Sequence, residues 1–203
     1  TLDPWFGITI PTNDLVWWVP FTLILWGALR ANQGPELPEE KLTPERFRGV
    51  LGEMKTDADE SLLDASRRRP VLVALLRHAG CTFCREAAAD LAQLEPLLRE
   101  RGLEPIVVTL SPPQRGRAFL DSFGLDGVAH VSDPDRRLYH AFDLKRGTFN
   151  QLFGPRVFLQ ALRAMRHGLG KSEGDGFLLP GTFVVNDGQV VAAQRHRTAG
   201  ERI

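Results

Sequence analysis

VLVALLRHAGCTFCREAAADLAQL, residues 71–94, carries the only two cysteines of this 203-residue chain. Its first six residues, 71–76, are all apolar, which predicts a strand buried on both faces. Apolar residues then recur at helical spacing from Cys84 onward, and Gly102 is expected to end that helix. Cys81 and Cys84 therefore stand where a strand gives way to a helix, at a separation that allows a reversible disulfide.

The rest of the chain alternates strands and helices in the same way. Buried strands are expected at 106–110 and 129–131, and helices at 114–123, 138–142 and 153–169. Two apolar segments, 182–185 and 190–193, flank an Asp-Gly pair that is typical of a hairpin turn. This order predicts an α/β fold of the thioredoxin-like type, with three α/β/α layers around a mixed central sheet.

An apolar arm, which we assign to residues 1–30, holds all four tryptophans of the chain. Residues 15–29 are uncharged and resemble a membrane anchor with interfacial tryptophans, but they are short for a span and contain Pro20. We expect either a helix that anchors the chain at a membrane or an arm that packs on the domain or on a second subunit of a homodimer. Residues 31–41 have the composition of a linker, so the thioredoxin-like domain is expected over 42–203.

The charge balance excludes one class of partner. Lys plus Arg and Asp plus Glu number 25 each, so no bulk attraction to nucleic acid is expected. Two closely spaced cysteines suit a working dithiol in a reducing compartment better than the disulfide framework of a secreted domain. We therefore expect a cytoplasmic protein, attached to a membrane if residues 15–29 act as an anchor.

The place of the cysteines at a helix N-terminus favours thiolate chemistry. Backbone N–H groups and the helix dipole stabilise an anion there, so Cys81 is expected to have a lowered pKa and the more exposed sulfur. Cys84 is expected to resolve a mixed disulfide or sulfenic acid formed at Cys81. Basic neighbours add positive charge that favours the thiolate. The supporting residues around the pair are Arg77, His78, Thr82 and Arg85.

Other interpretations of the cysteine pair remain open. A CxxC can form half of a zinc site, but the sequence has no second cysteine pair, and His78 with a distant histidine would have to complete it. A c-type haem attachment needs a histidine where this chain has Arg85. Two inert core cysteines are the remaining alternative. We expect a dithiol that works without a metal or a cofactor.

Three separated stretches carry a family resemblance. They are Gly80-Cys81-x-x-Cys84-Arg85-Glu86, then Gly174-Asp175-Gly176-Phe177 leading into Gly181-x-Phe183, and finally His196-Arg197. On these motifs the chain resembles the peroxiredoxin-like proteins of the alkyl hydroperoxide reductase and thiol-specific antioxidant (AhpC/TSA) group. Within that group it is similar to the branch that includes prostamide/prostaglandin F synthase and selenoprotein-like redox proteins. The resemblance implies that the CxxC reduces a peroxide or a disulfide and is recycled by a thioredoxin-like or low-molecular-weight thiol donor.

The chain departs from the peroxiredoxin motif Pro-x-x-x-Thr/Ser-x-x-Cys. Counted back from Cys81, the proline and hydroxyl positions hold Ala74 and His78. Counted back from Cys84, they hold Arg77 and Cys81. In that second register Cys84 would take the attacking role that we assign to Cys81.

Two further features lie near the end of the chain. Arg197 follows the last expected strand and could stabilise a thiolate, although surface charge shared with Arg195 is the interpretation that we favour slightly. Pro180 and Gly181 occupy the loop that faces the active site in thioredoxin-like proteins, so a cis bond is expected at Pro180.

The sequence thus supports a thiol-dependent oxidoreductase. The alternative is a non-catalytic binding or regulatory module that keeps the thioredoxin fold, associated with a membrane through its arm.

Overall fold

The computed structural model describes residues 42–147 and 177–196. The predictions for the arm, the linker, the helix at 153–169 and Arg197 lie outside these residues. Within the described ranges no helix combines the length and the apolar character that a membrane crossing needs.

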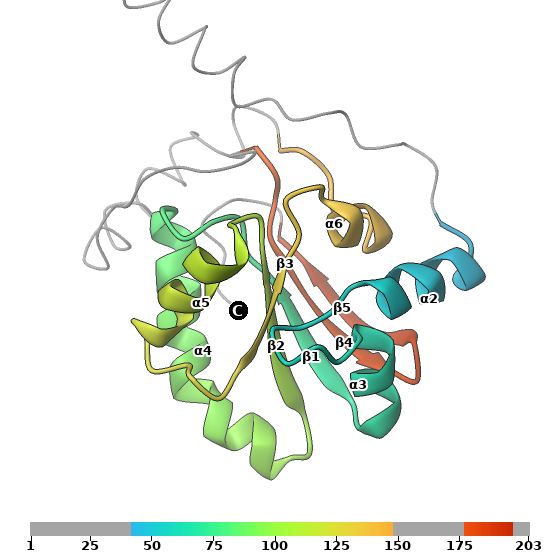
Figure 1. Cartoon of the computed structure of the whole chain (residues 1–203), viewed down its shortest axis with the longest axis horizontal. Helices are drawn as coiled ribbons and strands as arrows, with labels where there is room; N and C mark the ends of the chain where they lie inside the picture. Colours follow the sequence, from blue (N-terminus) through green and yellow to red (C-terminus); the bar gives the residue numbers. More distant parts are fainter. Residues whose placement is uncertain (1–41, 148–176, 197–203) are drawn as a thin grey trace, which may run out of the picture. The chain divides into compact units, whose positions relative to one another are not determined.

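A mixed five-stranded sheet forms the centre of the domain (Figure 1). The strand order is β3-β2-β1-β4-β5, in which β1, β2 and β3 are parallel, and β4 runs antiparallel to both β1 and β5. The strands are β1 (Val71–Leu75), β2 (Glu104–Thr109), β3 (Ala129–Ser132), β4 (Gly181–Asn186) and β5 (Gln189–Arg195). The helices are α2 (Pro44–Glu53), α3 (Leu62–Arg68), α4 (Thr82–Glu100), α5 (Pro113–Asp121) and α6 (Arg137–Ala141).

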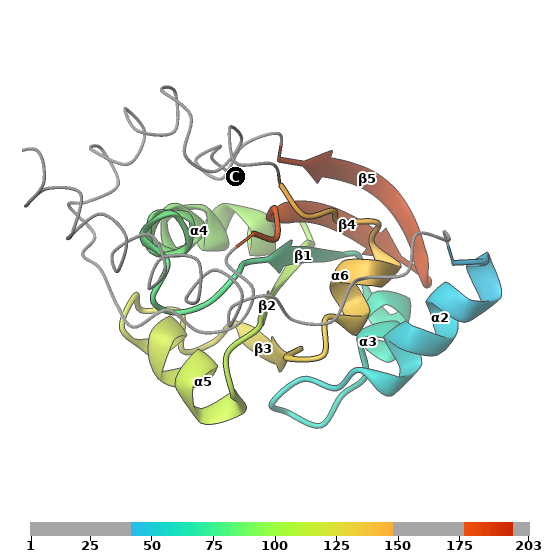
Figure 2. The same ribbon diagram turned by 90° about the horizontal axis from the view of Figure 1, so that it is seen from above.

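Helices cover both faces of the sheet, as Figure 2 shows. Alternate residues of β1 point to opposite sides, so Val73 packs with α2, α3 and α6, whereas Ala74 packs with α4 and α5. The three-layer α/β/α arrangement around a mixed sheet is therefore confirmed. The strands and helices predicted within 104–147 and 177–196 are present, with ends displaced by no more than two residues.

Local sequence signals explain where several elements begin and end. The Thr43 side chain accepts a hydrogen bond from the Arg46 amide and so caps α2, whose first residue is a proline. The predicted hairpin joins β4 to β5, and Asp187 and Gly188 adopt φ angles of 47° and 68° in its turn. Gly102, at φ 77°, follows the end of α4 as expected.

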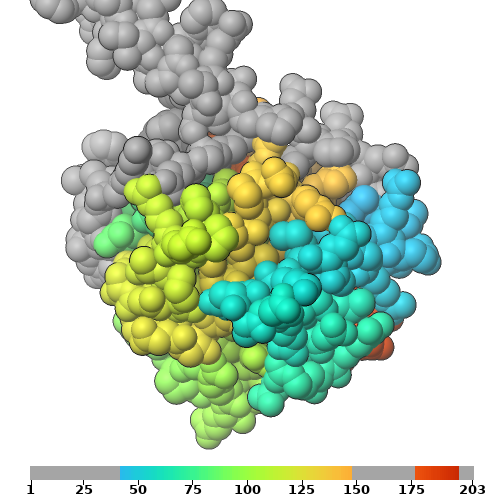
Figure 3. All heavy atoms as spheres, viewed as in Figure 1, coloured from blue at the N-terminus to red at the C-terminus, as the bar shows by residue number. Residues whose placement is uncertain are grey.

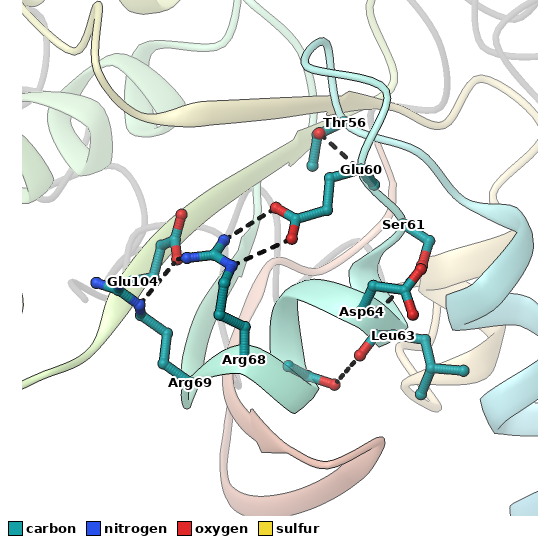
Figure 4. A network of polar contacts seen from close by, with 9 residues as sticks. Thr56, Glu60, Ser61, Leu63, Asp64, Arg68, Arg69 and Glu104 are labelled. Carbon is teal, nitrogen blue, oxygen red and sulfur yellow. Dashed lines mark hydrogen bonds and ion pairs between the residues drawn. The ribbon is translucent and has the colours of Figure 1, made fainter.

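An ion-pair network fixes the start of the two central strands (Figure 4). The Arg68 guanidinium donates to both carboxylate oxygens of Glu60, at 3.2 and 2.9 Å, and lies 2.9 Å from the Glu104 carboxylate. Arg69 approaches the same Glu104 carboxylate at 3.6 Å. The network ties the end of α3 to the first residue of β2, which pairs with the first residue of β1.

The edge strand β3 is covered by the loop between α2 and α3, which lies against it in Figure 3. Asp57 donates its amide to the His130 carbonyl and accepts the His130 amide on its carboxylate, at 2.9 and 3.0 Å. Arg117 holds the same Asp57 carboxylate at 3.0 Å. These contacts satisfy backbone groups that an edge strand would otherwise offer to another chain.

Candidate active site: the dithiol at the start of helix α4

The turn after β1 places Cys81 at the N-cap of α4. Its sulfur accepts a hydrogen bond from the Cys84 amide at 3.4 Å, and its carbonyl accepts the Arg85 amide at 3.0 Å. A cap residue accepts from amides that have no partner within the helix, and here a sulfur takes the place of the usual oxygen. The expected junction of strand and helix at the dithiol is thus present.

Arg77 contacts both sulfurs. Its guanidinium Nη2 donates to Cys81 Sγ at 3.0 Å, and its backbone amide donates to Cys84 Sγ at 3.3 Å. The Arg77 residue is only 7 % exposed, so its charge acts on the sulfurs with little screening by water. One residue therefore supplies a buried cation to one sulfur and a fixed amide to the other.

The pKa values of the two thiols are shifted in opposite directions. The pKa of Cys81 is lowered from 9.0 to about 5, mainly by the hydrogen bond from the Cys84 side chain, against the opposing effect of burial, with Arg77 and the first-turn amides adding to the decrease. Burial raises the pKa of Cys84 well above its ordinary value, and the neighbouring Cys81 sulfur raises it further. At neutral pH the arrangement holds a thiolate at Cys81 and a thiol at Cys84.

The sulfurs are less accessible than the sequence suggested. Cys81 is 7 % exposed and Cys84 2 %, so the expected order holds but both residues are buried. Thr82 lies half-buried between them in the first turn of α4. Both cysteines therefore have little contact with solvent.

The other basic neighbours behave differently from one another. His78 is buried, and desolvation together with the charges of Arg77 and Arg115 lowers its pKa to about 4. It is neutral at physiological pH, so the expectation that it adds positive charge to the pair is wrong. Arg85 is half-buried with its guanidinium 5.2 Å from the centre of the Phe123 ring.

A small cavity opens beside the dithiol on the Cys84 side. Its walls come from the end of β1, the first turns of α4 and the two segments that flank the β4–β5 hairpin. The lining residues are Leu76, Arg77, Phe83, Cys84, Ala87, Pro180 and His196. The structure thus brings Pro180 to the site, as the sequence predicted.

The cis bond expected at Pro180 is wrong, because every peptide bond of the described residues is trans. In the trans form the Pro180 carbonyl accepts the His196 amide at 3.2 Å, and Gly181 pairs with Leu75 in the sheet. A Cβ on Gly181 would lie 2.8 Å from a methyl carbon of Leu144, so glycine permits the close packing at this point.

Sequence reasoning missed two residues near the dithiol. The sequence analysis named His196 only as part of the His196-Arg197 motif and gave it no role, yet it is 5 % exposed and lines the cavity with Cys84. Tyr139, the single tyrosine of the chain, is fully buried and its hydroxyl donates to the Leu76 carbonyl just before Arg77. The sequence showed it only as a residue of the helix expected at 138–142.

A zinc site would need further ligands close to the two cysteines. In the part of the chain that the structure describes, no three His, Cys, Asp or Glu side chains gather closely enough to hold a metal ion.

Solved structures share the fold at low sequence identity. The bacterioferritin comigratory protein of Xanthomonas campestris, from a study of its alkyl peroxide reduction activity, superposes with a TM-score of 0.52 at 19 % identity, covering 79 % of this chain and 85 % of that one. A cysteine-to-serine mutant of PrxQ from Xylella fastidiosa gives 0.53 at 14 % identity, over 80 % and 87 % of the two chains.

Relatives by sequence cover a similar part of the chain. Peroxiredoxin-like 2A of Mus musculus is 27 % identical over 145 residues, which are 65 % of this chain and 61 % of the relative. The Rattus norvegicus protein of the same name is 30 % identical over 65 % of this chain and 58 % of its own length. The chain therefore spans about three fifths of the length of these curated relatives.

A family match covers more than half of the sequence. Residues 90–199 match the family described as AhpC/TSA antioxidant enzyme. The matched region begins just after Cys84, so it rests on the sheet and helices behind the dithiol and not on the cysteines themselves. With its thioredoxin-like fold and these relatives, the chain belongs to the AhpC/TSA family and is a peroxiredoxin-like protein of the thioredoxin superfamily.

Proposed function

We propose that this protein is a thiol peroxidase in which Cys81 attacks the substrate and Cys84 resolves the product. Membership of the AhpC/TSA family supports a redox function in general. The observation that carries the specific proposal is the 3.0 Å contact between the buried Arg77 guanidinium and Cys81 Sγ. That contact favours a thiolate on the sulfur that caps α4, and the thiolate is the nucleophile in thiol chemistry.

The first half of the cycle oxidises Cys81. Its thiolate attacks one peroxide oxygen, an S–O bond forms and the O–O bond breaks, and the departing alkoxide or hydroxide takes a proton to leave as alcohol or water. Cys81 becomes a sulfenic acid. The sulfur loses two electrons and the peroxide gains them.

The second half forms and then reduces a disulfide. Cys84 attacks the Cys81 sulfenic sulfur, an S–S bond replaces the S–O bond, and water leaves. A thioredoxin-like or low-molecular-weight thiol donor then restores both thiols through a mixed disulfide. The Cys84 amide, 3.4 Å from Cys81 Sγ, supports this pairing because it shows how closely the first turn of α4 brings Cys84 to Cys81.

Burial of the attacking sulfur favours a small substrate. A small peroxide group needs little exposed surface to reach a residue that is 7 % exposed, whereas a disulfide on a folded protein would have to approach its sulfur directly. The similar structure from Xanthomonas campestris comes from a study of alkyl peroxide reduction, which is the same class of reaction as the one proposed here. In this chain Arg77 supplies the guanidinium beside the thiolate. The chain has neither the proline nor the Thr/Ser of the peroxiredoxin motif at the corresponding positions.

A steady-state assay with a panel of peroxides tests the proposal. Thioredoxin and its reductase recycle the enzyme, and NADPH consumption is followed for the wild type, Cys81→Ser and Cys84→Ser. We expect turnover by the wild type, none by Cys81→Ser, and a single turnover by Cys84→Ser with this donor. Absence of thiol turnover in the wild type would instead favour the non-catalytic binding module.

A further inference from the structure

The cavity beside Cys84 contains one side chain that can exchange a proton at neutral pH. Four of its seven lining residues, Leu76, Phe83, Ala87 and Pro180, have no ionisable group, and Arg77 stays protonated. Cys84 is itself the reacting thiol. His196 remains, and an imidazole titrates near neutral pH in its ordinary state.

Backbone contacts hold His196 at this position. It follows the last residue of β5, where Arg195 pairs with Gly181. The His196 amide donates to the Pro180 carbonyl at 3.2 Å, which ties the end of β5 to the segment that enters β4. The imidazole is therefore carried by the end of β5, and α4 contributes Cys84 to the lining of the same cavity.

Cys84 needs a base when it resolves the sulfenic acid. Burial raises its pKa, so it is a thiol in the resting enzyme and must lose its proton as its sulfur attacks. Cys84 is 2 % exposed, which keeps bulk water from serving as the acceptor. A neutral imidazole has one nitrogen that donates and one that accepts, so it can keep a hydrogen bond to a neighbour and still take a proton.

Two arginines lie close to His196, Arg77 in the cavity wall and Arg195 beside it in the sequence. Arg77 lines the same cavity as His196. The Arg195 guanidinium is directed elsewhere, to the Phe142 carbonyl at 3.0 and 3.2 Å and to the face of the Phe183 ring.

We infer that His196 is the catalytic acid–base residue for Cys84. The inference rests on the proposed peroxidase cycle and assigns its second half. As Cys84 Sγ attacks the Cys81 sulfenic sulfur, its proton passes to a His196 ring nitrogen, the S–S bond forms and the S–O bond breaks. The departing hydroxide receives that proton and leaves as water, so His196 returns to its neutral form. During recycling the donor thiol attacks Cys81 Sγ and gives its proton to the neutral imidazole, the S–S bond breaks, and the imidazolium passes that proton to the departing Cys84 thiolate.

Rapid-quench mass spectrometry on the full chain separates the two halves of the cycle. The reduced enzyme is mixed with one equivalent of hydrogen peroxide, and samples are quenched with dimedone, which traps sulfenic acid, or with acid, which preserves the disulfide. The wild type is compared with His196→Asn and with His196→Gln as a second variant without a base. His140→Asn serves as the matched control, because His140 lies on α6 and does not line the cavity.

We expect sulfenic acid to form at the wild-type rate in both His196 variants and disulfide formation to slow by about a hundredfold, the lower range for loss of a general base. The slowed step should also accelerate with rising pH as hydroxide replaces the imidazole. Unchanged disulfide formation, or equal slowing of both steps, overturns the inference. A wild type that forms neither product refutes the peroxidase proposal as well, and so the two failures can be told apart. If neither variant folds, a solvent deuterium isotope effect confined to disulfide formation in the wild type supports the inference, and its absence overturns it.

Discussion

Replacing Arg77 by methionine removes a buried cation from the attacking sulfur while keeping an unbranched apolar stem. In the wild type the pKa of Cys81 is about 5, and the Arg77 contact is one of its causes after the Cys84 side-chain hydrogen bond. A hydrogen bond to a charged group contributes about 1.5–3 kcal/mol, and one pKa unit corresponds to about 1.4 kcal/mol. We therefore expect a rise of about one to two units.

Alkylation of a single thiol measures this shift. In a Cys84→Ser background, which keeps a hydroxyl donor beside Cys81, the rate of reaction with iodoacetamide is recorded against pH. One unit above the wild-type pKa, the thiolate fraction should fall about two- to tenfold in Arg77→Met. Arg115→Met is the control, since Arg115 is an exposed arginine that is among the causes of the His78 shift but not among those of the Cys81 shift, and its loss should leave Cys81 nearly unchanged.

The role assigned to the Arg77 contact is refuted if the Cys81 pKa stays near 5 in Arg77→Met. It is also refuted if Arg115→Met raises that pKa as much as Arg77→Met does, because the effect would then come from general positive charge and not from the buried contact.

Three other outcomes follow from the packing and the titrating groups. Gly116→Ala should destabilise the protein by about 1–3 kcal/mol in urea unfolding, because a Cβ there would overlap the buried His130 ring. Gly49 in α2 has open space around it, so Gly49→Ala should stabilise the protein by about 0.5–1 kcal/mol. Equal effects of the two substitutions on the free energy of unfolding would contradict this packing. The reduced wild type should gain stability over Cys81→Ser as pH rises from about 5 to 9, because the folded-state pKa lies below the unfolded one, and a flat difference in calorimetry would refute the thiolate. Tyr139→Phe should cost about 1–3 kcal/mol of unfolding free energy by leaving a buried carbonyl without its hydroxyl donor, and chemical denaturation with no loss would argue against that bond.

The order of strands and helices was predictable because hydrophobic periodicity reports burial directly. Residues 71–76 are apolar throughout, and β1 is covered on both faces by helices. The hairpin followed from Asp187-Gly188, since few residue pairs adopt two positive φ angles in succession. Such signals are local, so one sequence is enough to show them.

The surroundings of the dithiol depend on contacts between distant segments, which local patterns do not reveal. His78 is neutral because it is buried, and the residues next to it in the sequence do not reveal that burial. The role that we propose for His196 depends on the end of β5 and the start of α4 lining one cavity, although they are far apart in the sequence. The trans bond at Pro180 likewise depends on how β4 enters the sheet.

The most direct test of the dithiol mechanism is the mass of the peptide or peptides that carry Cys81 and Cys84 after the reduced protein meets one equivalent of peroxide. The mechanism predicts a single linked species lighter by two hydrogens, formed through a dimedone-trappable sulfenic acid on Cys81 and absent from both single cysteine-to-serine variants. Two free thiols that persist after this treatment, or a trapped sulfenic acid on Cys84 alone, would contradict it.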